Sequence, residues 1–207
     1  MKDGLFITFE GIDGCGKTTQ IELLSRKLED RNLGYLIVRE PGGTRIGEKI
    51  RNILLDNGNI DMEAKTELLL YSASRYQLSK QRLLPELKTG KVVICDRFYD
   101  STTAYQGYGR GLDIDFIESL NKFATDNLVP DLTIFLDISL EERNRRIGEN
   151  KLDRLENEEN TFHEKVRNGF FKLSEKNKER FIKLDGTEKI ERISQKIWNK
   201  IERKING

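Results

Sequence analysis

Two hydrophobic patterns alternate along this chain. Short apolar runs rich in β-branched and aromatic residues are typical of strands that are buried on both faces of a parallel sheet. Such runs lie at 5–10, 35–39, 92–96, 132–137 and 181–184. The stretches between them repeat apolar residues every three or four positions, which indicates helices with one buried face. These predicted helices cover 18–31, 46–55, 62–84, 115–125, 140–146, 161–177 and 190–204.

The alternation of strand and helix predicts an α/β fold. We expect a five-stranded parallel sheet flanked by helices on both faces, formed by residues 1–207 as a single domain. One polar, weakly periodic segment, 148–154, lies between two predicted helices, and we expect it to be a mobile flap. Ligands of such sheets bind beyond the carboxyl ends of the strands, so the polar residues after each strand form the candidate site.

The composition narrows the possible partners. The chain has 36 basic and 35 acidic residues among 207, with a formal net charge of +1, so no overall field attracts nucleic acid or a membrane surface. No apolar run is long enough to span a membrane, and no signal-peptide pattern opens the chain. Two cysteines are too few for a disulfide framework or a metal-ligand set. We therefore expect a cytoplasmic protein without nucleic-acid or membrane partners.

The strongest motif lies between the first predicted strand and the first predicted helix. It matches the phosphate-binding loop G-x-x-x-x-G-K-[ST] and consists of Gly11, Ile12, Asp13, Gly14, Cys15, Gly16, Lys17 and Thr18, followed by Thr19. Glycines let backbone N–H groups converge on an anion, and the following helix directs its positive dipole end at the same point. Lys17 supplies a charge for the β- and γ-phosphates, and the Thr18 hydroxyl is a candidate Mg²⁺ ligand. The motif predicts binding of a nucleoside triphosphate.

Charged residues stand where two further strands end. Arg39 closes the second strand before a turn of proline and glycine, and Arg51 lies on the next helix. Asp96 and Arg97 close the third, apolar strand. A buried carboxylate is costly unless it is paired or near a metal, so we expect Asp96 to serve Mg²⁺ and Arg97 a phosphate. The alternatives are an ordinary turn with a surface arginine at position 39 and a structural ion pair at 96–97.

Side chains suited to a planar ligand follow. Tyr71 and Arg75 are four residues apart on a predicted helix and therefore share one face. An aromatic ring can stack on a base while an arginine donates to an exocyclic oxygen, although Tyr71 as an ordinary core residue is the alternative. The segment 101–107 adds short hydroxyls, a tyrosine and an amide, groups that can recognise the edges of a small polar ligand.

The number of arginines at the strand ends indicates a second anionic ligand. A triphosphate on the glycine-rich loop already has Lys17 and a metal ion, yet Arg39, Arg51, Arg75 and Arg97 remain. We infer two phosphorylated ligands head to head beneath a flap. That arrangement suits phosphoryl transfer between nucleotides, because a flap excludes the water that would hydrolyse the triphosphate.

In these features the whole chain resembles the bacterial type of the thymidylate kinase (dTMP kinase) family of P-loop nucleoside monophosphate kinases. The shared strings are Phe9-Glu10-Gly11 leading into the phosphate loop and Thr19-Gln20; Arg39-Glu40-Pro41-Gly42-Gly43-Thr44; Tyr71 to Arg75; Asp96-Arg97-Phe98; Ala104-Tyr105-Gln106-Gly107; Pro130-Asp131-Leu132-Thr133; and Leu152-Asp153-Arg154-Leu155. The resemblance implies the reaction ATP + dTMP → ADP + dTDP with Mg²⁺. It also implies a P-loop NTPase fold, a short mobile lid at residues 143–156 (the flap above) and a homodimer.

The resemblance further implies how dTMP is recognised. Tyr71 would stack on thymine and Arg75 would bond thymine O4, while Thr102 and Gln106 would contact the thymine edge and its N3–H. Tyr105 would leave no room for a ribose 2′-hydroxyl.

The remaining implied roles concern sugar, phosphate and catalysis. Asp13 would bind the sugar 3′-hydroxyl, and Arg39, Arg51 and Arg97 would hold the dTMP phosphate. The implied catalytic residues are Lys17, Asp96, Arg97 and one basic residue of the lid, because Gly14 stands where other members carry a basic residue in the phosphate loop. The competing lid residues are Arg143, Arg145, Arg146, Lys151 and Arg154, of which we favour Arg146 and then Arg154.

Three other functions compete with this interpretation. A kinase for another nucleoside monophosphate or for deoxynucleosides would share most motifs. A regulatory GTPase would need N-K-x-D, and no Asn-Lys pair here has an aspartate two residues later. An inactive interaction domain is disfavoured by the retained Lys17, Thr18, Asp96 and Arg97. The only histidine, His163, is expected on a helix surface or at the hinge of the flap.

Overall fold

A computed structural model describes residues 4–148 and 152–206. Its centre is a five-stranded sheet in the order β2-β3-β1-β4-β5, and every neighbouring pair is parallel. The strands are β1 (Leu5–Glu10), β2 (Tyr35–Arg39), β3 (Val92–Asp96), β4 (Leu132–Asp137) and β5 (Phe181–Asp185). The sequence prediction of this sheet is therefore confirmed, with boundaries that differ by at most one residue at β5.

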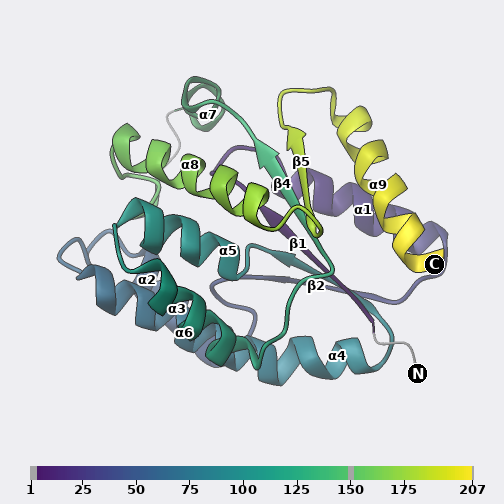
Figure 1. Ribbon diagram of the computed structural model, residues 1–207, viewed down its shortest axis with the longest axis horizontal. Coiled ribbons are helices and arrows are strands. Elements are labelled where there is room, and N and C mark those ends of the chain that lie inside the picture. The colour runs from purple at the N-terminus through teal and green to yellow at the C-terminus, as the bar shows by residue number, and fades with distance from the viewer. Residues whose placement is uncertain (1–3, 149–151, 207) are drawn as a thin grey trace.

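Helices cover both faces of the sheet. Figure 1 shows α1 and α9 side by side on one face, α8 and α5 on the other, and α2, α3, α4 and α6 grouped together below β2. The helices are α1 (Lys17–Asp30), α2 (Arg45–Leu55), α3 (Ala64–Leu78), α4 (Leu84–Lys88), α5 (Tyr99–Thr102), α6 (Ile114–Thr125), α7 (Leu140–Ile147), α8 (Asn160–Lys176) and α9 (Ile190–Asn206), with two π-helical segments, η1 (Ser79–Leu83) and η2 (Thr103–Gly109).

The side-chain alternation of β1 explains why both faces need a cover. Ile7 and Phe9 belong to the apolar cluster that includes Leu24 of α1. Phe6, which points to the opposite face, packs in a second cluster with Leu78 and other residues of the segment from α3 to α4. Burial on both faces removes apolar surface from water along the whole strand, which is the main stabilising contribution to a central parallel strand.

The structure differs from the sequence prediction in two regions. The helix predicted over 62–84 is interrupted by η1, and α4 continues to Lys88. The polar stretch after β3 was not predicted as helix, yet it forms α5 and η2. Tertiary packing explains the second difference: a Cβ on Gly169 of α8 would lie 2.7 Å from the Tyr108 ring, so the absence of a side chain there lets α8 lie close to η2.

The strand register brings the predicted site residues to one edge. Phe9 of β1 and Arg39 of β2 are both paired with Asp96 of β3, so the three strands end together at their carboxyl ends. The loops that follow these strands therefore lie next to one another, at the position where parallel α/β sheets bind ligands.

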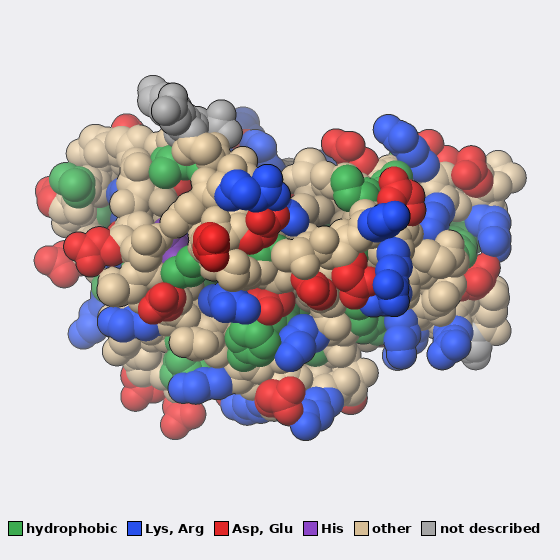
Figure 2. Space-filling model, turned by 90° about the horizontal axis from the view of Figure 1, so that it is seen from above, with side chains coloured by type: hydrophobic (Ala, Val, Ile, Leu, Met, Phe, Trp, Pro, Cys, Tyr) green, Lys and Arg blue, Asp and Glu red, His purple; other side chains and the backbone are tan. Residues whose placement is uncertain are grey.

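The distribution of surface charges and the state of the two cysteines can be compared with the expectations from composition. Figure 2 shows acidic and basic side chains interspersed on the face seen from above. Both cysteines, Cys15 and Cys95, are free and buried. None of the helices within the described residues is long and apolar enough to span a membrane.

Candidate active site

The phosphate-binding loop contains glycines whose positive φ angles are rarely adopted by residues with a side chain. Gly11 has φ +135°, and a Cβ on it would lie 2.4 Å from the carbonyl oxygen of Leu136. Gly16, with φ +98°, occupies the N-cap of α1, where an unrestricted backbone lets the helix begin directly behind the loop. The free N–H groups of the first turn of α1 therefore point into the loop and favour an anion.

Lys17 is buried inside this loop without a carboxylate partner among the described residues. Its Nζ donates to the carbonyl oxygens of Gly11 at 3.1 Å and Ile12 at 3.2 Å, and lies 3.6 Å from Sγ of Cys15. Neutral carbonyl groups compensate a buried ammonium only in part. The charge of Lys17 therefore remains available to a phosphate that enters the loop.

Arg97 lies at the centre of the site in a strained backbone conformation. Its φ is +66°, in the left-handed region that residues other than glycine rarely adopt. The side chain is held by Nη1 donating to the Gly11 carbonyl oxygen at 2.8 Å and Nη2 donating to Oδ1 of Asp13 at 2.5 Å. Burial alone would raise the pKa of Asp13, but the charges of Arg97 and Lys17 outweigh it and hold the pKa below its ordinary value. Local strain of this kind is often found at functional sites.

Glu10 supports the conformation of Arg97 through hydrogen bonds to the residues that follow it. This buried residue at the end of β1 accepts from the backbone N–H of Phe98 at 2.8 Å, and its Oε2 lies 2.5 Å from Oγ of Ser101. Ser101 in turn accepts from Nη1 of Arg97 at 3.3 Å. Burial, together with the nearby charge of Asp100, raises the pKa of Glu10 to about 8. Glu10 thus fixes the turn that directly follows Arg97.

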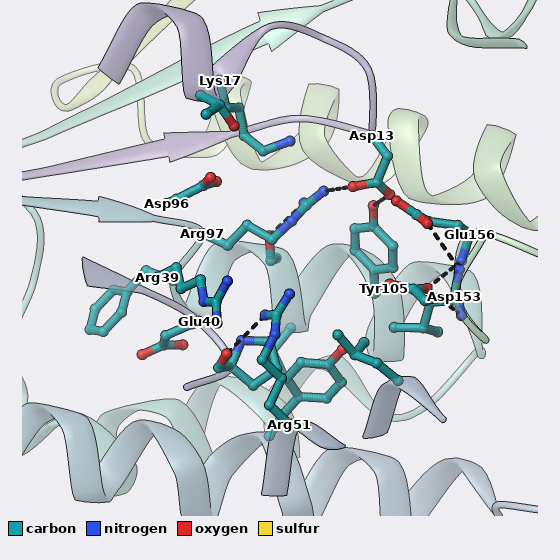
Figure 3. A pocket seen from close by; sticks show the side chains of 18 of the residues that line it. Asp13, Lys17, Arg39, Glu40, Arg51, Asp96, Arg97, Tyr105, Asp153 and Glu156 are labelled. Carbon is teal, nitrogen blue, oxygen red and sulfur yellow. Dashed lines mark hydrogen bonds and ion pairs between the residues drawn. The ribbon is translucent and has the colours of Figure 1, made fainter. Parts of the chain in front are cut away.

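A cavity of about 540 Å³ extends from the phosphate loop toward α2 and α3. Figure 3 shows Lys17 and Asp13 on one side of Arg97, with Arg39 and Arg51 approaching from the opposite side. The predicted residues that line the cavity are Asp13, Gly14, Gly16, Lys17, Thr18, Thr19, Arg39, Arg51, Tyr71, Arg75, Asp96, Arg97, Thr102, Tyr105, Gln106 and Arg146. The structure therefore brings the phosphate-binding loop and the residues predicted for the second ligand together in one cavity.

Gly11, Ile12 and Cys15, the remaining residues of the loop, do not line this cavity. Ile12 and Cys15 are almost completely buried among apolar side chains, and Gly11 contributes its carbonyl oxygen to Lys17 and Arg97. Ile12 and Cys15 shape the loop through their side chains and Gly11 through its backbone, and any contact of the three with a phosphate would come from the backbone.

The end of the cavity near α3 is lined by groups suited to a base. Arg75 is almost fully buried and forms an ion pair with Glu40. Its Nε donates to Oε2 of Glu40 at 2.7 Å, and its Nη2 lies 2.6 Å from the same oxygen. Its Nη1 lies 3.4 Å from Oδ1 of Asn121. The hydroxyl of Thr102 is buried in the cavity wall and has no hydrogen-bond partner among the described residues. A buried polar group without a partner costs free energy, so Thr102 is a position that a polar ligand would stabilise.

Two side chains are suited to bind a magnesium ion whose other ligands would be phosphate oxygens and water. Oδ1 of Asp96 is buried and has no partner among the described residues, and Thr18 lines the same cavity as Asp96. The described residues contain no group of three or more His, Cys, Asp or Glu side chains that could hold a metal alone. Mg²⁺ is commonly bound through one or two protein oxygens, with phosphates and water completing its octahedron. The residues present therefore fit this ion.

The two favoured lid arginines lie in different surroundings. Arg146 lines the cavity, donates through Nη1 to the carbonyl oxygen of Gly14 at 3.1 Å, and is paired with Glu142. Arg154 does not line the cavity: its guanidinium is buried against Glu67 at 2.6 Å. The geometry favours Arg146 for contact with a phosphate, and both catalytic assignments stay predictions.

The other lid candidates are spread over α7 and beyond. Arg143 is buried and donates to the carbonyl oxygen of Glu156, and Arg145 is exposed and paired with Glu142. Lys151 falls outside the described residues. His163 is fully buried in α8 beside the same Glu156 carbonyl, so the expected helix-surface position is wrong, whereas contact with the lid agrees with the hinge alternative.

Several residues of the site were missed by the sequence analysis. Glu10 and Glu67 lie beside the cavity, and Asp153, Leu155 and Glu156 of the lid line it, none of them with a role assigned from the sequence. Glu10 carried a usable signal, because it closes an apolar strand in the same way as Asp96. Glu67 precedes Tyr71 and Arg75 at intervals of four residues, and so shares their helix face.

Comparison with known proteins identifies one family. The family model described as thymidylate kinase matches residues 9–197 of this chain. A thymidylate kinase from Caldanaerobacter subterraneus subsp. tengcongensis is 47% identical over 204 residues, which are 99% of this chain and 98% of that protein. A thymidylate kinase from Clostridium novyi is 46% identical over 200 residues, covering 95% of this chain and 98% of that protein.

A solved structure is similar over almost the whole chain. The crystal structure of thymidylate kinase from Ehrlichia chaffeensis superposes with a TM-score of 0.79 at 35% sequence identity, covering 97% of this chain and 99% of that one. The likeness in sequence and the likeness in structure thus agree along almost the full length.

Proposed function

The chain belongs to the thymidylate kinase family and phosphorylates dTMP to dTDP, and from this premise we propose that ATP is the donor, with Mg²⁺, and that the two nucleotides meet at Arg97. One observation carries the proposal. A single cavity joins a phosphate-binding loop to Arg39 and Arg51, and the Arg97 guanidinium lies between them. A lone triphosphate would leave the arginines at the far side without a ligand.

The proposed chemistry is a direct transfer between two anions. A phosphate oxygen of dTMP attacks the γ-phosphorus of ATP, a new P–O bond forms, and the bond to the β–γ bridging oxygen breaks to release ADP. The acceptor phosphate is already a nucleophile, so no strong base is needed, and positioning with charge neutralisation supplies the catalysis. When bound, Mg²⁺ would be held by Thr18 and the water shell near Asp96, and would neutralise charge on the phosphates.

The chain's own cations divide this work. Lys17 contacts the donor phosphates, Arg39 and Arg51 hold the acceptor phosphate, and Arg97 contacts the group in transit. Arg146 completes the charge from the lid. The donor and acceptor are both polyanions, so most of the neutralising charge must already be in position before they bind.

Recognition of dTMP is assigned to the end of the cavity near α3. Arg75 donates to thymine O4, Tyr71 stacks on the ring, and Thr102 and Gln106 contact the edge. Burial raises the pKa of Tyr71 above its ordinary value, so its phenol stays protonated and uncharged beside the base. Asp13 accepts from the 3′-hydroxyl of the sugar.

A panel of acceptors tests this function directly. Purified protein with ATP and Mg²⁺ is offered dTMP, dUMP, UMP, dCMP, GMP and AMP, and the diphosphate products are quantified. We expect dTMP to have the highest kcat/KM and the ribonucleotides the lowest. Faster phosphorylation of any ribonucleotide or of dCMP would assign the chain to another nucleoside monophosphate, and a lack of all transfer would refute the proposal.

Replacing Tyr105 with alanine is expected to relax the exclusion of ribonucleotides. The Tyr105 ring packs against Phe162 and Phe170, and its hydroxyl lies 3.3 Å from Oδ2 of Asp13, so the ring is fixed beside the proposed sugar position. Removing it should lower the ratio of kcat/KM for dUMP over UMP by about tenfold or more, because the steric conflict with a 2′-hydroxyl disappears. Tyr105→Phe keeps the ring and serves as the control, with the ratio expected to stay unchanged. Equal ratios in both variants would refute this role.

We further propose that the chain is a homodimer that pairs through α3 and α6. Leu69 and Tyr76 are seven residues apart on α3, Phe116 and Phe123 are seven apart on α6, and all four are more than two-fifths exposed. The rings of Tyr76 and Phe123 stack with centroids 6.2 Å apart, so the two helices present one apolar surface. Contiguous exposed apolar surface of this kind commonly marks an interface.

Phe123→Glu is expected to convert the dimer to a monomer, because the interface would then bury an unpaired charge. Sedimentation velocity should report half the mass of the parent protein. Ile190→Glu places the same charge on an exposed apolar residue of α9, across the sheet, and should leave the dimer intact. A parent protein that sediments as a monomer would remove the proposal.

A cytoplasmic location is also proposed. Both cysteines are unpaired thiols, which is the usual state in a reducing compartment, and the reaction requires ATP.

A further inference from the structure

Glu67 of α3 is a fully buried carboxylate beside the cavity, and it does not line the cavity itself. Its Oε1 accepts from Nε2 of Gln106 at 2.9 Å and from Nε of Arg110 at 3.2 Å. Its Oε2 accepts from Nη2 of Arg110 at 3.1 Å and from Nη2 of Arg154 at 2.6 Å. Two arginines and one amide therefore surround a single carboxylate.

These partners keep Glu67 ionised. Burial alone would raise its pKa, but hydrogen bonds from Arg110 and Gln106 outweigh the burial and hold the pKa below the ordinary value. An ionised carboxylate accepts hydrogen bonds and cannot donate them. Only the amide nitrogen of Gln106, and not its oxygen, can therefore face Glu67.

The orientation of the Gln106 amide follows from this restriction. The amide group is planar, with nitrogen and oxygen on opposite sides of its axis, so the oxygen points away from Glu67. Gln106 is one of the residues that line the cavity beside Tyr105 and Thr102. The cavity is thus offered a hydrogen-bond acceptor at this position.

The polarity of that group matters for pyrimidine selection. Thymine presents a donor at N3–H and an acceptor at O4, whereas cytosine presents an acceptor at N3 and a donor amino group at C4. Arg75 can only donate, so its polarity is fixed by its own chemistry. A glutamine can turn its amide and match either base, and nothing in Gln106 itself prevents that.

We propose that Glu67 is a positioning residue that fixes the amide of Gln106 with its oxygen toward the base, and that this orientation contributes to the selection of dTMP over dCMP. The inference rests on the proposed function, which assigns Gln106 to the edge of the base. The alternative is that Glu67 only neutralises Arg110 and Arg154.

The arrangement also connects the lid to base recognition. Arg154 follows the undescribed part of the lid, and its Nε donates to the carbonyl oxygen of Leu54 at 2.9 Å. Its second contact is the carboxylate that orients Gln106. The lid segment that carries Arg154 therefore shares a hydrogen-bond network with a proposed thymine contact.

Glu67→Gln tests the orientation, because a glutamine at this position can both accept and donate. The Gln106 amide is then free to turn, and we expect the ratio of kcat/KM for dTMP over dCMP to fall by about tenfold or more, through changes in KM. Arg110→Met is the matched control: it removes an ion pair of Glu67 but leaves the Gln106 contact, so the ratio should stay within about twofold. Equal losses in both variants would support the structural alternative and overturn the proposal.

A double-mutant cycle separates an action through Gln106 from a general effect. In a Gln106→Ala background, Glu67→Gln should no longer change the dTMP to dCMP ratio, because the amide that it orients is gone. If Glu67→Gln lowers the ratio equally in both backgrounds, Glu67 does not act through Gln106 and the proposal fails.

Two further comparisons keep the test decisive. If Glu67→Gln does not fold because Arg154 loses its partner, Glu67→Gln combined with Arg154→Met removes both buried charges, and its ratio is compared with that of Arg154→Met alone. If the parent enzyme selects dTMP and Glu67→Gln has the same ratio of kcat/KM for dTMP over dCMP, this inference is refuted and the proposed function stands. A parent enzyme without preference for dTMP would refute both.

Discussion

Replacing Arg97 with alanine is expected to lower kcat for dTDP formation by about 10³- to 10⁵-fold, the range in which a transition-state arginine contributes to phosphoryl transfer. Arg97 is the guanidinium that lies between the phosphate loop and the acceptor side of the cavity. It is held there by Gly11 and Asp13, so little reorganisation is needed when charge develops on the transferred group. Steady-state turnover with saturating ATP and dTMP measures the effect.

The backbone of Arg97 offers a matched control for folding. Its φ of +66° is unfavourable for any residue with a Cβ, but not for glycine. Arg97→Gly should therefore be more stable to unfolding than Arg97→Ala by about 1 kcal/mol, while both variants lose turnover to the same extent. The assignment would be contradicted if the more stable Arg97→Gly retained clearly more turnover than Arg97→Ala. Near-normal dTDP formation by either variant would also contradict it.

The fold was largely predictable because its signals are local. Five apolar runs gave the strands, and the order of strands and helices gave the parallel sheet, since parallel strands need long crossover connections, which are usually helices. The region after β3 was not predictable in this way. The segments α5 and η2 have no apolar period of their own, and they are stabilised by packing against α8, a contact between residues distant in the sequence.

The site was predictable where one residue type has one chemical use. A glycine-rich loop with Lys17 indicates phosphate, and Asp96 at the end of an apolar strand indicates a paired or metal-bound carboxylate. Arg154 shows the limit of this reasoning. The sequence placed it among the basic residues of the lid, but its actual partner, Glu67, is 87 residues away and comes from another element. Only the folded chain determines whether an arginine faces a ligand or a buried carboxylate.

Replacing Lys17 with methionine is expected to lower kcat by about 10²- to 10³-fold without destabilising the fold. Lys17 is 7% exposed, and the hydrogen bonds of its ammonium group go to two carbonyl oxygens and a sulfur. Methionine fills a similar volume and removes a buried charge whose desolvation those partners only partly offset. The midpoint of thermal unfolding without nucleotide should therefore stay constant or rise.

Lys27→Met is the control for Lys17→Met. Lys27 lies on the same helix, donates to the carbonyl oxygen of Ser194 and stands over the Trp198 ring, away from the cavity, so its loss should leave turnover unchanged. Adding ATP should raise the unfolding midpoint of the parent more than that of Lys17→Met, because at one ATP concentration the protein with the lower Kd gains more stability. A Lys17→Met protein that turns over normally, or that unfolds at a much lower temperature, would show that this lysine serves the fold. A stable but inactive protein would instead show that the loop retains an energetically costly charge because the donor phosphates require it.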